Sequence, residues 1–105
     1  METTMTPERS DMEMRALRLT PGHDLRRALE CAEYAEGCSA AFVLSGIGSL
    51  ERAHLRRAGA DDAEALQGPL EVLTLAGSIA ANGSHLHASL ADASGVVQGG
   101  HQIGR

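Results

Sequence analysis

Three histidines in the last quarter of the chain form its clearest chemical pattern. His85 and His87 enclose a single leucine, and residues two apart on a β-strand point to the same face. Two imidazoles on one face can approach the same ion. Zinc is often held by three histidines, with a further position open to water or another ligand. The third ligand must come from a neighbouring strand, for which His101 is the candidate.

Turn chemistry predicts where His101 falls. Residues 92–95 (Asp-Ala-Ser-Gly) suit a type I turn that ends in a left-handed glycine, which gives a three-residue hairpin loop. Counting outward from such a loop pairs His87 with His101 on one face, whereas a two-residue turn would put His101 on the opposite face. The sequence therefore predicts a divalent-metal site, with zinc as the expected ion, formed by His85, His87 and His101.

A second candidate site is basic. Arg52 and Arg56 share one face of an expected strand with His54, so an anionic ligand could bind there. A solvated face or a face between subunits would show the same pattern. We keep Arg52 and Arg56 as candidate anion-binding residues.

Two other motifs favour structure over chemistry. Gly46-Ile47-Gly48 resembles the start of a phosphate-binding loop, but Glu51 stands at the third glycine position and a strand is expected to follow. A structural turn is the better interpretation. The sequence contains no G-x-S-x-G nucleophile elbow, so a serine hydrolase is disfavoured.

The elements that must position these residues are one helix and several short strands. Asp24 is the expected N-cap of the helix, whose apolar face has helical spacing, and Gly37 is its expected C-terminal cap. Asn82-Gly83 predicts a hairpin turn. The expected strands span residues 14–19, 39–44, 50–57, 69–80, 85–91 and 96–101, with an acidic connector over 59–68. This pattern predicts an α+β fold, a mostly antiparallel sheet with the helix packed on it.

Composition narrows the class of protein. Hydrophobic residues make up 43% of the chain but aromatic residues only 2%, so the core is thin and an oligomer interface is expected to add buried surface. A net charge of −5 gives no basic footprint for nucleic acid. The first residues lack a hydrophobic signal segment and no membrane span is expected, which favours the cytoplasm and reduced thiols at Cys31 and Cys38.

Several blocks together resemble the plant and prokaryote conserved (PPC) domain family. The most distinctive is residues 41–50 (AFVLSGIGSL), and the other matching blocks are residues 17–25, 68–79, 85–92 and 95–101. The resemblance implies an antiparallel α+β domain that assembles as a trimer. Plant members accompany AT-hook segments, and prokaryotic members carry a DNA-binding label. This chain has no Arg-Gly-Arg-Pro core of an AT-hook, so nucleic acid is a doubtful partner.

The PPC fold is also similar to that of acetolactate decarboxylase, whose zinc is held by a His-x-His pair and a later histidine. That likeness transfers to His85, His87 and His101 alone. We expect a flexible tail over residues 1–13 and the PPC-like domain over 14–105. Because PPC domains usually continue past the Gly-Gly-His block, we expect this domain to lack its last strand or strands.

The expected function is a trimeric metal-binding module with a binding or regulatory role. The alternative is a zinc-dependent enzyme acting on a small carbonyl or carboxylate compound, for which Glu71 and Asp92 are the only nearby acids. The sequence leaves open whether the protein is an enzyme. A small-molecule ligand fits either function.

Overall fold

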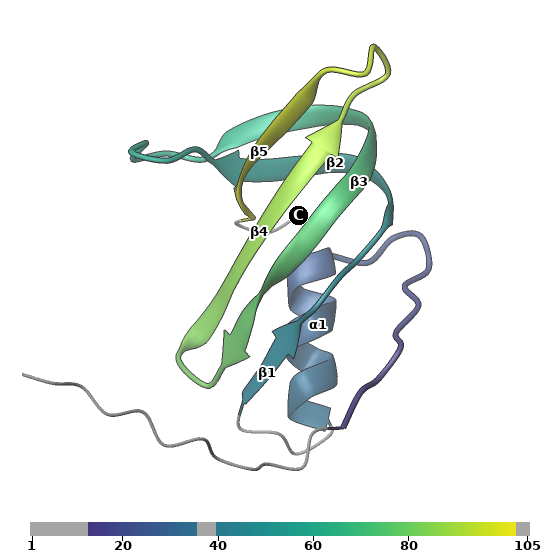
Figure 1. Cartoon of the computed structure of the whole chain (residues 1–105), viewed down its shortest axis with the longest axis vertical. Helices are drawn as coiled ribbons and strands as arrows, with labels where there is room; N and C mark the ends of the chain where they lie inside the picture. Colours follow the sequence, from purple (N-terminus) through teal and green to yellow (C-terminus); the bar gives the residue numbers. More distant parts are fainter. Residues whose placement is uncertain (1–12, 36–39, 103–105) are drawn as a thin grey trace, which may run out of the picture.

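A computed structural model describes residues 13–35 and 40–102, which form one helix and five strands (Figure 1). The expectations for the tail, for Gly37 and Cys38, and for the end of the domain fall partly or wholly outside these residues. The helix is α1 (Leu25–Ala35). The strands are β1 (Ala40–Val43), β2 (Gly48–Arg56), β3 (Glu64–Ala80), β4 (Gly83–Ala91) and β5 (Val97–Gln102).

All strand pairings are antiparallel, and four of the strands close a circuit. The long strand β3 pairs with β2 through its first half and with both β1 and β4 through its second half. The last strand, β5, joins β4 to β2. The curvature of β3 around this circuit is visible in Figure 1. The predicted α+β class, with a mostly antiparallel sheet, is therefore confirmed.

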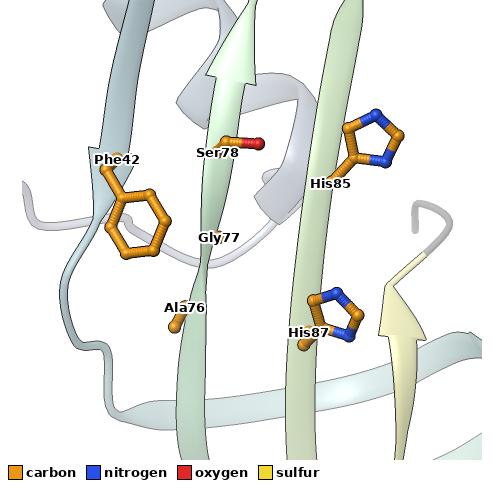
Figure 2. Close-up of a pocket in the computed structure, with 6 residues that line it drawn as sticks. All are labelled: Phe42, Ala76, Gly77, Ser78, His85 and His87. Atoms are coloured by element: carbon orange, nitrogen blue, oxygen red, sulfur yellow. The ribbon is translucent and has the colours of Figure 1, made fainter. Parts of the chain in front are cut away.

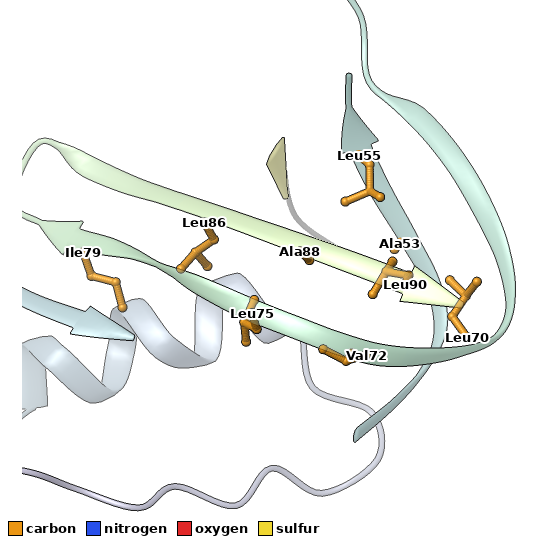
Figure 3. Close-up of a cluster of buried hydrophobic side chains, with 9 residues drawn as sticks. All are labelled: Ala53, Leu55, Leu70, Val72, Leu75, Ile79, Leu86, Ala88 and Leu90. Carbon is orange, nitrogen blue, oxygen red and sulfur yellow. The ribbon is translucent and has the colours of Figure 1, made fainter. Parts of the chain in front are cut away.

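The core lies on the concave face of the curved sheet. Alternate residues of β4 point inward, and Leu86 and Leu90 are almost fully buried there. Leu25 and Leu29 of the helix pack against this core. Figure 3 shows the buried side chains, with the helix alongside the part of the core that holds Leu75 and Ile79. The buried apolar side chains are small or aliphatic: Ala53, Leu55, Leu70, Val72, Leu75, Ile79, Leu86, Ala88 and Leu90.

Local signals at the helix and at both hairpins are confirmed. The Asp24 carboxylate accepts a hydrogen bond from the Arg27 amide at 3.1 Å, as an N-cap does. The hairpin predicted from Asn82-Gly83 joins β3 to β4, with Ala80 paired to Gly83. A strand, β2, follows the Gly-Ile-Gly turn, so no helix N-terminus is offered to a phosphate there.

The strand predicted over residues 14–19 is wrong. These residues form no strand, and Met14 and Leu17 are exposed. Alternating apolar residues are compatible with a strand, but a strand also needs a partner edge, which the pattern does not supply.

The acidic connector predicted over residues 59–68 is wrong in its second half. β3 begins at Glu64, and its first residues pair with β2 from Arg52 to Leu55. Backbone pairing overrides the unfavourable strand propensity of this segment, whose side chains are mostly exposed. Within the described part of the chain, no helix is long and apolar enough to cross a membrane.

Candidate metal centre

The turn between β4 and β5 has the predicted conformation. The Gly95 amide donates to the Asp92 carbonyl at 2.9 Å, and the Asp92 amide donates to the Val96 carbonyl at 3.0 Å. The Asp92 carboxylate accepts from the Ser94 and Val96 amides at 2.9 and 3.0 Å. Gly95 has φ of +84°, the left-handed conformation that the loop requires. The predicted three-residue loop is confirmed.

This loop sets the register of the histidines. His87 lies directly opposite His101 in the β4–β5 pair. The ring centroids of His87 and His101 are 5.2 Å apart, and those of His85 and His101 are 5.6 Å apart. The predicted register is confirmed, and the three rings meet on the outer face of the sheet. Figure 2 shows His85 and His87 on this face, with the helix behind the sheet.

The spacing of the rings fits a shared ion, but the rings are not yet turned toward one. With Zn–N bonds of about 2.0–2.1 Å in a tetrahedral site, two ligating imidazoles have centroids about 5 Å apart. The ring planes of His85 and His101 meet at 76°, edge to face. No group of three or more His, Cys, Asp or Glu side chains in residues 13–35 and 40–102 is arranged as a formed metal site. Coordination therefore requires rotation of the side chains, while the backbone spacing already suits it.

His101 differs from the other two histidines in its surroundings. Its side chain is half-buried, whereas His85 and His87 are exposed. Burial lowers the pKa of His101, and the nearby His87, Arg56, His85 and Arg26 lower it further. These effects favour the neutral form of His101, which is the form that metal ligation requires.

A polar cluster ties the helix to β4 next to His85. Arg26 Nε donates to Ser84 Oγ at 2.7 Å, and Ser84 Oγ donates to Glu30 Oε2 at 3.0 Å. Ser84 is only 2% exposed, so this hydroxyl needs both partners. The cluster fixes the start of β4 and, with it, the backbone that carries His85.

A shallow hollow of about 260 Å³ adjoins the histidines. It is lined by Phe42, Ala76, Gly77, Ser78, His85 and His87 (Figure 2). Sequence reasoning missed Phe42, which lies on β1 and reaches the hollow because β1 pairs with the second half of β3. Strand pairing over this distance leaves no local signal in the sequence.

The two candidate anion-binding arginines lie at different places. Arg56 pairs directly with His101 across β2 and β5. Arg52 is four residues further back on the same strand, opposite Gln67, which puts it about 13 Å from Arg56 along the strand. The structure thus brings Arg56, but not Arg52, to the histidines.

The two candidate acids, Asp92 and Glu71, are engaged or placed away from the histidines. Asp92 is engaged by the turn amides, as described above. Glu71 pairs with Ser49 and Ala91, away from the row that holds His87. Neither carboxylate is among the groups that act on the pKa of His101.

The fold and the site together define a small α+β domain with an exposed histidine cluster on its antiparallel sheet. Residues 6–105 match the model of the Plants and Prokaryotes Conserved (PCC) domain, and the chain belongs to this family. The resemblance to PPC domains is thereby confirmed.

Known proteins similar to this chain span different lengths. The Bifunctional protein GlmU of Synechococcus sp. is 46% identical over 85 residues, which are 81% of this chain and 14% of GlmU. A hypothetical protein from Salmonella enterica is 35% identical with a TM-score of 0.79, covering 84% of this chain and 64% of its own. A protein from Archaeoglobus fulgidus described as metal-containing is 31% identical with a TM-score of 0.73, covering 84% and 67%.

Proposed function

We propose that this domain is a divalent-metal-binding module in which His85, His87 and His101 hold one ion, with zinc the best fit. The observation that carries the proposal is the pairing of His87 with His101, which gathers three rings on one exposed face. Imidazole nitrogens suit zinc, copper, nickel or iron better than magnesium or calcium. The metal-containing relative from Archaeoglobus fulgidus supports the same proposal.

Coordination in this proposal begins with rotation of the rings. His85 and His87 are exposed, so their side chains can change rotamer without displacing a packed neighbour. Three protein ligands would leave at least one position for water or a small molecule. A bound ion would supply Lewis acidity there, and the chain's own residues would hold and orient the ligand.

A binding or regulatory role ranks before catalysis in this proposal. An enzyme needs a titratable acid or base beside the ion, and the carboxylates of Asp92 and Glu71 are directed to other contacts or positions. A zinc-dependent enzyme acting on a small carbonyl or carboxylate compound is the second candidate, favoured by the hollow beside the histidines. The proposed location is the cytoplasm.

We further propose that the module works as a homotrimer. Large apolar side chains remain exposed on the single chain, among them Ile47 at 89% and Leu44 at 64%. Large apolar side chains this exposed are typical of a protein interface when they lie together in one patch.

The metal proposal is tested by the zinc affinity of single-site variants. His87→Ala removes the central ring of the three and is expected to abolish tight binding. His54→Ala and His23→Ala are the matched controls, since neither position belongs to the cluster, and they should retain one zinc per chain. Competition with a chromogenic chelator gives the affinities. Equal zinc binding by His87→Ala and the wild type would contradict the proposal.

A further inference from the structure

A row of paired residues crosses the outer face of four strands through the histidine cluster. Arg56 on β2 pairs with His101 on β5, which pairs with His87 on β4, which pairs with Ala76 on β3. Directly opposed residues of antiparallel strands share a face, with Cβ atoms roughly 4.5–5.5 Å apart. The row therefore has a cation at one end, an apolar residue at the other, and two of the candidate ligands between them.

A second row runs alongside on the same face. His85 on β4 pairs with Ser78 on β3, which pairs with Phe42 on β1. Phe42, Ala76 and Ser78 line the hollow together with His85 and His87, as Figure 2 shows. The histidines thus separate a guanidinium on β2 from a largely apolar hollow on β3 and β1.

The charge on this face is unbalanced. The Arg56 side chain is exposed, and no ion pair or hydrogen bond engages it within the residues that the structure describes. Three neutral imidazoles leave the double charge of a bound divalent ion uncompensated, and Arg56 adds another positive charge. The missing partner is therefore an anion.

We propose that this face binds a small carboxylate with a short apolar tail. Its oxygens lie between the ion and the Arg56 guanidinium, and its tail lies against Phe42 and Ala76. A planar guanidinium matches a carboxylate through two parallel hydrogen bonds. A hollow of about 260 Å³ holds only a short tail. This inference rests on the proposed metal site and names the ligand class of that site.

The test is calorimetric titration of the zinc-loaded full chain with 3-methylbutanoate. The ligands for comparison are acetate, which lacks the tail, 3-methylbutanol, which lacks the charge, and inorganic phosphate. We expect 3-methylbutanoate to bind most tightly. Arg56→Gln should weaken it by about tenfold or more, as loss of a charge-assisted pair does. Phe42→Ala should reduce its affinity to that of acetate.

Arg52→Gln is the matched control, because it removes the same charge from the same strand away from His101. It should leave 3-methylbutanoate binding unchanged. Equal effects of the two arginine variants, tighter binding of phosphate, or equal binding of the alcohol would each overturn the inference. Zinc content is measured on every sample. One zinc per chain without carboxylate binding overturns the inference alone, whereas loss of zinc from the wild type overturns the proposed function as well.

Discussion

At the scale of single residues, the three histidines differ in their exposure to solvent. His85 and His87 are exposed and free to change rotamer, whereas His101 is half-buried between β2 and β4. A half-buried ligand whose surroundings favour its neutral form fixes one corner of a site. The two exposed rings can then close on the ion.

The protonation of the ligands makes zinc binding depend on pH. An imidazolium cannot ligate a metal, and an unperturbed histidine has a pKa of about 6.5. Zinc affinity should therefore fall as the pH drops through this range, because protons compete for the ligand nitrogens. The lowered pKa of His101 favours its neutral ring, so its share of this pH dependence falls at lower pH than that of an unperturbed histidine. Chelator competition at several pH values measures the trend, and an affinity that stays constant down to about pH 5 would indicate carboxylate ligands instead.

At the scale of elements, the close approach of β3 and β4 decides the position of His85. Gly77 has φ of +148°, and a Cβ placed on it would lie 1.9 Å from the His85 carbonyl oxygen. Any side chain at this position pushes the two strands apart next to a candidate ligand. Gly77 thus has two roles: it lines the hollow, and it allows β3 and β4 to approach closely beside His85.

Gly77→Ala is expected to destabilise the fold by about 1–3 kcal/mol, the usual cost of overpacking, and to weaken zinc binding. Gly83→Ala is the matched control, since Gly83 also has a positive φ, +123°, but a Cβ there meets nothing within 4 Å. Urea denaturation gives the free energies of unfolding. Equal losses in the two variants would show that backbone conformation, and not the contact with β4, accounts for the effect.

The hairpin elements were predictable from the sequence because their signals are local. The turn at residues 92–95 carries its own hydrogen-bonding groups, and a three-residue loop determines which residues face each other. Counting residues outward from this loop along both strands gives the pairing of His87 with His101. The N-cap at Asp24 is local in the same sense.

Pairings between distant segments were not predictable in this way. Nothing near Arg56 indicates that β2 lies beside β5, and nothing near Phe42 indicates that β1 lies beside β3. The strand predicted over residues 14–19 failed for the related reason that its pattern does not specify a partner edge. The strand at residues 64–67 was missed because its pairing with β2 outweighs its acidic, turn-like composition.

At the scale of the whole molecule, the exposed apolar side chains and the aromatic-poor core suggest that one chain does not complete the folded unit. We expect a trimer in solution, held by burial of residues such as Leu44 and Ile47. Multi-angle light scattering at micromolar concentration measures the mass. A stable monomer would contradict the expectation.

The charge of the whole chain also bears on nucleic acid. With a net charge of −5 and no AT-hook, the chain offers too few phosphate contacts to release many counterions. We expect weak or undetectable binding of duplex DNA near physiological salt in a gel-shift assay. Sequence-selective binding with a sub-micromolar Kd would contradict this.

The most direct test of the account is a crystal structure of the zinc-loaded protein with anomalous data at the zinc edge. We predict one anomalous peak per chain on the outer face of the sheet, with nitrogens of His85, His87 and His101 at about 2.0–2.1 Å and at least one open position. An ion held by other residues, or the three rings without an ion between them in zinc-saturated crystals, would contradict it.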